Sequence, residues 1–444
     1  MSTLLERAKG SALDIIAHHD APSRTISLIS SRSQQIRCLE ITQSYWQDII
    51  TFSESISGRL PLLRNLKISI LDGYIPGGQP SVVTPSSLHL FGGSTNLEKL
   101  VLRTATPSFL SHFIFPNLTT LELSAFSVRE CSASYLLDFL KASPALQTVE
   151  VDIPPAIVLG DIPQEMVVAL PNVKTISLHV FGEPTTHVYN IAAHISCPCA
   201  RYTYLTHEVF NTDLNADVEI FPTPVSWNKI IRQYMASPIE EVSLGLKLED
   251  LQCSLTFRSS GATVVTSNFG VIEMGENEDA LSFEELGWEI FYQALNTIQD
   301  RPLLSHVKRF HIKYTASMPD PHGMGYMMDT VRELFSSLGP LDELTIHGCD
   351  LRIFLAEFLG DLGFDDPEQP IVFPHIKELT ILHPSMNTHY IECMDAIEEL
   401  AKSQHALGIP FERVKIRMWD IPGGMAEELR RWVDIVDCRA EIGP

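Results

Sequence analysis

A short pattern with apolar residues at its first, fourth and sixth positions recurs along most of the chain. Its copies are Ile36–Ile41, Leu63–Ile68, Leu97–Leu102, Leu118–Leu123, Leu146–Val151, Val173–Leu178, Ile239–Leu244, Val307–Ile312, Leu341–Ile346, Ile376–Ile381 and Phe411–Ile416. Most copies follow one another after about 20 to 35 residues, as in leucine-rich repeats. The gaps from Val173 to Ile239 and from Ile239 to Val307 are about twice as long, so we expect one further degenerate unit in each.

Between the copies, apolar residues return at the three- and four-residue spacing of a helix. Met327, Val331, Leu334 and Leu338 form one such stripe. Further stripes are Trp227, Ile230, Ile231 and Tyr234; Trp288, Phe291, Leu295 and Ile298; and Tyr390, Met394, Ile397 and Ala401. Alternation of strand and helix predicts an α/β fold, an irregular leucine-rich-repeat solenoid with a curved parallel sheet on the concave side and helices on the convex side.

The pattern also divides the chain. Residues 1–35 are predicted to be an N-terminal cap segment, residues 36–424 the solenoid, and residues 425–444 a C-terminal capping helix that carries Met425, Leu429, Trp432, Val433 and Val436 on one face. A β-hairpin insertion is expected near 245–284, because two β-rich runs flank Ser259-Ser260-Gly261.

Composition narrows the functional classes. The 444 residues include 32 Lys and Arg against 55 Asp and Glu, a formal charge of -23, which opposes binding to phosphate backbones and anionic lipid surfaces. We therefore expect no nucleic-acid or membrane partner. No apolar run of signal-peptide or membrane-spanning length is found, and the eight cysteines lack the spacing of a disulfide framework, so a cytoplasmic or nuclear location is expected.

Several phrases resemble the fungal, chiefly basidiomycete, F-box-like proteins with leucine-rich repeats. These are RAKGSALDIIAHH, IRCLEIT, LPLLRNLKISI, LHLFGGSTNLEKLVL, FPNLTTLEL, LLDFLKASPALQTVEV and CSLTFRSSGATV. The resemblance implies that the repeats select substrates, while an F-box docks the Skp-type adaptor of a cullin-type ubiquitin ligase. RAKGSALDI resembles the segment that follows the F-box and begins at Arg7, so the resemblance covers the repeat region only and no F-box is expected in this chain.

Motifs for chemistry are sparse. The nucleophile-elbow, phosphate-loop and zinc-hydrolase patterns are absent from the sequence, so we expect a protein that is not an enzyme and has no cofactor or metal. Cys197-Pro198-Cys199, with His194 and His207, is the best metal candidate, but its spacing is tighter than that of a zinc knuckle and no second cysteine pair follows. His18-His19-Asp20 is more typical of an exposed turn.

Outward-facing strand positions are the candidate binding site, because they form the continuous sheet face of a solenoid. The predicted partner-binding residues are Arg309, His311, Lys313, Glu343, His347, Arg413, Lys415 and Arg417. The triplets Arg309/His311/Lys313 and Arg413/Lys415/Arg417 would concentrate an acidic partner segment. The alternative interpretation is that these are ordinary water-facing polar residues.

These observations predict a non-enzymatic protein–protein interaction module that binds a protein partner on the concave sheet face. A substrate-recognition subunit of a cullin-type ubiquitin ligase, with a Skp-type adaptor bound through an F-box upstream, is the alternative. A hydrolase that uses histidines of the concave face is a minor one.

Overall fold

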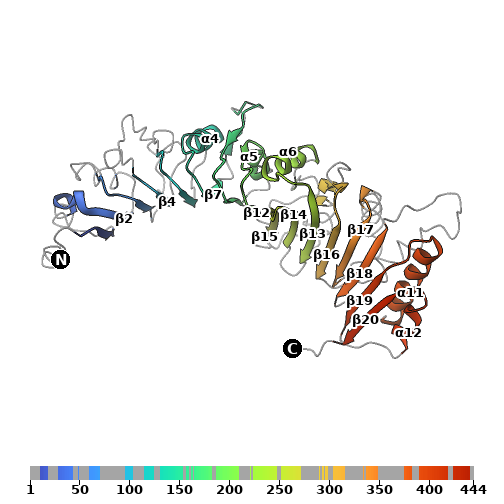
Figure 1. Cartoon of the computed structure of the whole chain (residues 1–444). Helices are drawn as coiled ribbons and strands as arrows, with labels where there is room; N and C mark the ends of the chain where they lie inside the picture. The colour runs from blue at the N-terminus through green and yellow to red at the C-terminus, as the bar shows by residue number, and fades with distance from the viewer. Residues whose placement is uncertain are drawn as a thin grey trace, which may run out of the picture. The chain divides into compact units, whose positions relative to one another are not determined.

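The computed structural model of the 444-residue chain shows an α/β protein with one large, mostly parallel sheet of 16 strands and few helices (Figure 1). The structure describes residues 11–18, 29–43, 49, 60–70, 96–103, 115–124, 131–153, 157–159, 162–163, 165–182, 187–209, 221, 224–247, 252–271, 290, 293–294, 296–298, 304–315, 334, 337–348, 375–382, 390–418 and 424–440. Within these residues, no helix is both long and apolar enough to cross a membrane.

The chain folds into two compact units, and the first comprises residues 1–181 and 190–205. Its sheet strands are β1 (Leu13–Ala17), β2 (Ile36–Gln43), β3 (Asn65–Ile70), β4 (Lys99–Arg103), β5 (Thr120–Ser124), β7 (Thr148–Ile153) and β10 (Thr175–Gly182). They lie in this order and pair parallel. Helix α4 (Ala133–Lys141) buries Leu136, Leu137 and Leu140. Two short parallel pairs complete this unit: β6 (Cys131–Ser132) with β8 (Ile157–Val158), and β9 (Val168–Ala169) with β11 (Ile195–Ser196).

The second unit comprises residues 182–189 and 206–444. Its strands are β13 (Ile239–Lys247), β14 (Gln252–Ser259), β15 (Val264–Val271), β16 (Arg309–Thr315), β17 (Leu341–His347), β18 (Ile376–Leu382), β19 (Arg413–Met418) and β20 (Ile435–Ala440). From β13, strands β16 to β20 follow in parallel. The helices of this unit are α6 (Pro224–Tyr234), α11 (Tyr390–Ala406) and α12 (Met425–Leu429). Strand β12 (Tyr202–Val209) and helix α5 (His187–Ala192) cross the division between the units along the chain.

One backbone contact repeats from strand to strand. The Arg64 carbonyl accepts hydrogen bonds from the backbone N–H groups of both Glu98 and Lys99, at 2.8 and 2.9 Å. The carbonyls of Glu98, Thr119, Gln147, Lys174 and Lys308 each accept two N–H groups at the start of the next strand in the same way. A backbone carbonyl has two lone pairs and can accept two hydrogen bonds. By accepting both from the next strand, it links each unit of the pattern to the following one.

A tight turn precedes six of the sheet strands, β3, β5, β7, β10, β12 and β16. The N–H groups of Leu63, Leu118, Leu146, Val173, Ala200 and Val307 each donate to the carbonyl three residues earlier. In two of the turns an asparagine side chain adds a contact to the preceding turn, Asn96 Nδ2 to the Pro61 carbonyl at 2.8 Å and Asn172 Nδ2 to the Pro144 carbonyl at 3.0 Å. Each turn thus buries an apolar residue immediately before its strand.

The core follows the alternation of the pattern. Leu121, Val149 and Ile176 stand at one level in the first unit, Phe310 and Leu379 stand at one level in the second, and all five are 0% exposed. Leu121, Val149, Phe310 and Leu379 each lie between apolar partners on the two neighbouring strands, as a parallel sheet covered by further structure requires. Ile176 lies between Val149 and the buried Thr203 of β12. Among the helices, α6 buries Trp227, Ile230 and Tyr234 and α11 buries Ile397, Leu400 and Ala401, as their stripes predict.

One of the two long gaps holds the expected further strand. Strand β12 begins at Tyr202. The Tyr202 N–H donates to the Lys174 carbonyl, which is the same contact that links other successive strands. The second expectation is wrong, because β13 pairs directly with β16 and no parallel strand intervenes. The residues between them include the predicted β-hairpin, β14 and β15, which pair antiparallel. The hairpin does not interrupt the sheet: β15 and β14 lie between β12 and β13 and continue it.

At the C-terminal end, the helix predicted over 425–444 is much shorter. Helix α12 ends at Leu429, and residues Ile435–Ala440 form β20, which pairs parallel with β19. Val433, Val436 and Cys438 fit the six-residue strand pattern, and Val433 and Val436 fit the helical stripe as well, so backbone pairing with β19 decides between them. At the other end, the predicted cap segment contains β1, the first strand of the sheet. Most of the stripe from Met327 to Leu338 lies outside the described residues.

We expect Leu121→Ala to lower the free energy of unfolding by about 2 to 5 kcal/mol, because it empties a fully buried site. Hydrogen exchange read by mass spectrometry should quicken in β4 and β7, the neighbours of β5, and stay unchanged in β17 and β18. Val225→Ala, at a side chain 79% exposed, is the control and should change little. Uniform acceleration throughout the sheet would contradict stabilisation by nearest neighbours.

Candidate polar sheet face

The predicted site residues lie in three rows that run across neighbouring strands. The first row joins Glu241, Arg309, Glu343, Glu378 and Arg413, and the second joins Ser243, His311, Thr345, Thr380, Lys415 and Asp437. In the third row Lys313 pairs with His347 and Arg417 pairs with Arg439, and Leu382 stands between these two pairs. We call this set, together with Arg258 of β14, the polar face. Because parallel pairing without a bulge keeps the register, side chains two residues apart on each strand remain on the same side.

Three carboxylates organise the cations of this face. Glu241 on β13 lies 3.2 Å from Arg258 Nε and 3.2 Å from Arg309 Nε, and its Oε1 is 3.9 Å from His311 Nε2. The Glu241 side chain is 15% exposed, while Arg258 and Arg309 are 55% and 47% exposed. The carboxylate therefore lies low on the face and the guanidinium groups extend above it.

Glu378 on β18 has the same role for the second predicted triplet. Lys415 Nζ donates to its Oε1, and Arg413 Nη1 lies 3.5 Å from its Oε2. Thr380 Oγ1 also donates to Oε1, at 3.4 Å. Two cations from one strand thus meet one acidic side chain of the neighbouring strand, so the triplet is held in place by Glu378.

Asp437 on β20 completes the series. Arg417 Nη2 donates to Asp437 Oδ2 at 3.0 Å and Arg439 Nε donates to Oδ1 at 3.1 Å. The hydrogen bond from Arg417 lowers the pKa of the Asp437 carboxyl below its usual value. Arg417 also reaches the Asp437 carbonyl, at 3.2 Å, which orients its guanidinium along the sheet edge.

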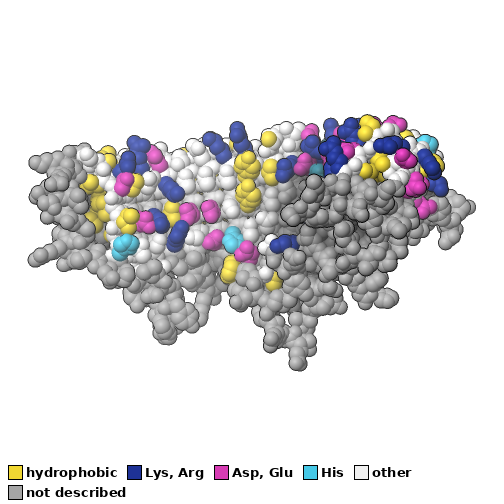
Figure 2. Space-filling view, turned by 90° about the horizontal axis from the view of Figure 1, so that it is seen from below, with side chains coloured by type: hydrophobic (Ala, Val, Ile, Leu, Met, Phe, Trp, Pro, Cys, Tyr) yellow, Lys and Arg dark blue, Asp and Glu magenta, His cyan; other side chains and the backbone are white. Residues whose placement is uncertain are grey.

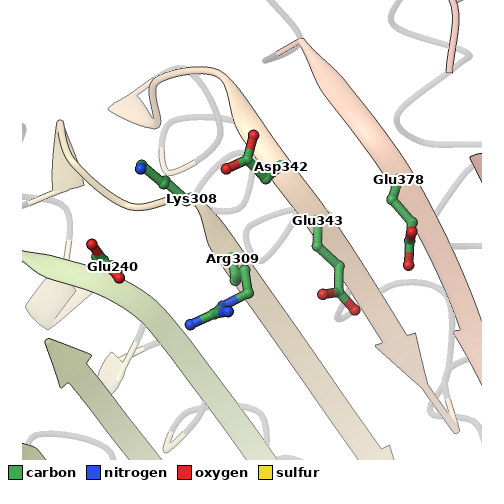
Figure 3. Close-up of a pocket in the computed structure, with 6 residues that line it drawn as sticks. All are labelled: Glu240, Lys308, Arg309, Asp342, Glu343 and Glu378. Atoms are coloured by element: carbon green, nitrogen blue, oxygen red, sulfur yellow. The ribbon is translucent and has the colours of Figure 1, made fainter. Parts of the chain in front are cut away.

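The remaining predicted residues are less constrained. Glu343 accepts a hydrogen bond from Thr345 Oγ1 at 2.9 Å and stands level with Glu378 of the next strand. Lys313 is exposed and makes no ion pair with any described residue, and His347 is half-buried. A depression of about 430 Å³ is lined by Glu240, Lys308, Arg309, Asp342, Glu343 and Glu378 (Figure 3). It is open and carries more acidic than basic groups.

Charges also alternate where the strands begin. Glu240, Lys308, Asp342, Lys377 and Glu412 precede β13 or the parallel strands that follow it, or lie in their first residues, and they reverse sign at each step. Lys377 Nζ donates to Asp342 Oδ1 at 2.6 Å, and this hydrogen bond raises the Lys377 pKa. Opposite charges on adjacent strands favour the observed register over a shifted one.

The polar face is more basic than the chain as a whole. It carries seven Lys and Arg (Arg258, Arg309, Lys313, Arg413, Lys415, Arg417 and Arg439) against four acidic residues (Glu241, Glu343, Glu378 and Asp437). Figure 2 shows Lys and Arg interleaved with Asp and Glu over the C-terminal strands. The local excess of cations stands against a formal charge of -23 for the whole chain.

The Cys197-Pro198-Cys199 candidate has a structural explanation. It forms the tight turn before β12, with the Ala200 N–H donating to the Cys197 carbonyl at 2.9 Å. Cys197 is fully buried, which raises its pKa to about 12, whereas Cys199 is exposed, so the two sulfurs face different surroundings. His194 Nδ1 donates to the Met166 carbonyl at 2.7 Å. No group of three or more His, Cys, Asp or Glu among the described residues is arranged to hold a metal.

The structure describes His18, whereas His19 and Asp20 lie outside the described residues. Two histidines of the sheet lie beside carboxylates, His311 near Glu241 and His179 Nδ1 at 3.4 Å from Asp152 Oδ1. Comparison with known proteins finds no matching family model and no matching curated protein.

The sequence reasoning missed the three organising carboxylates. Glu241 and Glu378 are outward residues of the same pattern as Arg309 and Arg413, so their strand position was visible, but not their pairing. Asp437 was missed because residues 425–444 were expected to be helical.

The Arg417–Asp437 contact predicts a pH dependence. Because the folded-state pKa of Asp437 is lowered, its stabilising contribution is present above the unfolded pKa near 3.8 and is lost as pH falls through the folded value. Asp437→Asn should therefore be less stable than the parent at pH 7, and the difference in free energy of unfolding should diminish as the pH falls below 3.8. A difference that is independent of pH, measured by denaturant titration, would contradict this assignment.

Proposed function

We propose that the chain is an irregular leucine-rich-repeat solenoid that acts as a protein–protein interaction module, and that its polar face binds an acidic segment of a protein partner. The recurrent sequence pattern, the successive parallel strands and the repeated shared carbonyl support the solenoid interpretation. The localisation proposed with it is cytoplasmic or nuclear.

The observation that carries the binding proposal is the vertical order of charges on the polar face. Glu241 and Glu378 lie low, at 15% and 20% exposure, and Arg309 and Arg413 extend over them at 47% and 42%. At Asp437 the order is reversed, because Arg417 is 18% and Asp437 29% exposed. A guanidinium has five N–H donors, and Glu241 or Glu378 engages only part of them. An approaching partner therefore meets fixed cations with unused donors, a geometry suited to carboxylates.

Prior pairing with internal carboxylates also has an energetic role. It holds long side chains in place before binding, which saves conformational entropy, but it also offsets part of the positive charge that a partner meets. For an acidic partner the loss of attraction is the larger of the two effects. If these charges served only solubility, it would not matter which carboxylate lies beneath which cation. Variants that change the two groups separately can therefore distinguish the two interpretations.

A peptide of alternating Glu and Gly residues serves as the acidic probe, with affinity measured by fluorescence anisotropy at two salt concentrations. Arg309→Glu combined with Arg413→Glu should weaken binding by about tenfold or more, because attraction becomes repulsion at the centre of the face. The control, Lys141→Glu with Lys402→Glu, makes the same change in net charge at exposed positions of α4 and α11. An equal loss in both double variants, or no binding by the parent chain, would refute the proposed site.

Removal of a low-lying carboxylate should strengthen binding of the acidic peptide, whereas reversal of the two arginines weakens it. Glu378→Gln leaves Arg413 and Lys415 without their acidic partner, so the probe should bind a few-fold more tightly while the fold is retained. Circular dichroism checks the fold and the same anisotropy assay measures the gain. Weaker binding by a folded Glu378→Gln variant would show that attraction by the exposed cations does not drive recognition.

A second proposal, substrate recognition in a cullin-type ubiquitin ligase, rests on the sequence resemblance to F-box-like leucine-rich-repeat proteins. In that case the partner on the polar face would be a substrate, and a Skp-type adaptor would bind elsewhere. Binding of a purified Skp-type adaptor to the 444-residue chain, measured by calorimetry, tests this proposal. A lack of adaptor binding would refute this proposal.

A further inference from the structure

Aromatic side chains are grouped on the same sheet side in the first unit. Tyr202 and Tyr204 of β12 are 47% and 37% exposed, and Phe181 of β10 is 45% exposed. The two tyrosine rings are nearly parallel, with an interplanar angle of 6° and centroids 6.4 Å apart. A compact group of hydrophobic side chains is visible on this face in Figure 2. Phe181 is on the same outward side but lies four residues beyond Ser177, the residue level with Tyr204, so its ring contact is with His179. The aromatic group is therefore the stacked pair Tyr202 and Tyr204, whose joint exposure is more than solubility requires.

The register places this group beside an acidic strand. Ser177 pairs with Glu150 and His179 pairs with Asp152, between β10 and β7. The Thr175 N–H donates to the Gln147 carbonyl, and the Tyr202 N–H donates to the Lys174 carbonyl in the same way. Tyr202 is therefore level with Thr175. Two residues farther along, Tyr204 is level with Ser177. With strands about 4.8 Å apart, the α-carbons of Glu150 and Tyr204 are separated by about 10 Å. Only the short Ser177 side chain lies between them.

The carboxylate of Glu150, beside the tyrosines, can accept hydrogen bonds from a partner. Glu150 is exposed and makes no ion pair with any described residue. The next strand adds Glu122, level with Glu150, although Glu122 also contacts Arg103 at 3.3 Å. Lys174 and Arg201 are cations, but they lie where the strands begin, one row before Thr175 and Tyr202. The middle of the face therefore combines aromatic rings on one side with carboxylates on the other.

We propose that the outward face of β7, β10 and β12 binds an arginine-containing segment of a protein partner. The guanidinium lies against the ring faces of Tyr202 and Tyr204, and Glu150 accepts its hydrogen bonds across Ser177. A guanidinium is planar, stacks on aromatic rings and donates to carboxylates in its own plane, so it satisfies both halves of the face at once. This surface uses other strands than the polar face and does not depend on the acidic partner proposed for it.

Arginine fits this face better than the other candidate groups. A lysine ammonium is a compact, strongly hydrated charge and gains less from two parallel rings. A neutral sugar would use the rings but leave the exposed carboxylate without a charged partner. The formal charge of -23 further favours approach by a cationic segment.

The test uses three peptides of equal length, with Arg-Gly, Lys-Gly or citrulline-Gly repeats, and measures their affinity for the 444-residue chain by fluorescence anisotropy. The Arg-Gly peptide should bind most tightly, at least several-fold above Lys-Gly, and citrulline-Gly should not bind measurably. Tyr202→Ala with Tyr204→Ala should reduce Arg-Gly binding by about tenfold without any change in net charge. Glu150→Gln should reduce it by several-fold.

Matched controls separate this site from general attraction to an acidic protein. Tyr135→Ala removes an exposed tyrosine of α4, and Glu165→Gln removes an exposed carboxylate elsewhere; neither should change binding. The Arg309→Glu/Arg413→Glu variant should retain Arg-Gly binding, so failure here and failure of the acidic-partner site are distinguishable. The proposal would be overturned if the Arg-Gly and Lys-Gly peptides bound equally well and the tyrosine variant had no effect. It would also be overturned if a neutral cello-oligosaccharide bound to the parent chain and not to the tyrosine variant.

Discussion

Backbone pairing between successive parallel strands is the constraint on which the rest of this structure depends. A single carbonyl at the start of one strand accepts N–H groups from two consecutive residues of the next, and this contact recurs from Arg64 to Lys308. It fixes where each strand begins relative to its neighbour. Apolar side chains such as Leu121 and Val149 are then stacked at one level, and each covers part of the next.

The same register determines the chemistry of the exposed side. Because outward residues fall into rows, a charge on one strand lies about 5 Å from the corresponding residue of the next, and pairs such as Lys415 and Glu378 form. Neither residue needs a special backbone conformation. The outward surface therefore varies through side-chain identity alone: carboxylates and tyrosines occupy β7 and β12, and arginines paired with carboxylates occupy β13 to β20.

The strands were predictable from sequence because an apolar pattern six residues long has a strong signal of its own. Arg309, His311 and Lys313 were correctly placed on one outward face for the same reason. Pairing partners were not predictable, since they depend on which units are adjacent: β13 is next to β16 despite the long intervening segment, and Glu241 therefore meets Arg309. The segment from Ile435 was assigned to a helix because Val433 and Val436 satisfy both periodicities, and only contact with β19 selects the strand.

The central claim is that an acidic segment binds the sheet face and not the helical side of the chain. Lysine acylation read by mass spectrometry, with and without the Glu-Gly peptide, tests it most directly. The account predicts that Lys313 and Lys415 are protected by the peptide, while Lys141 of α4 and Lys402 of α11 react at unchanged rates. Protection of the helix lysines with Lys313 and Lys415 still reactive would contradict it.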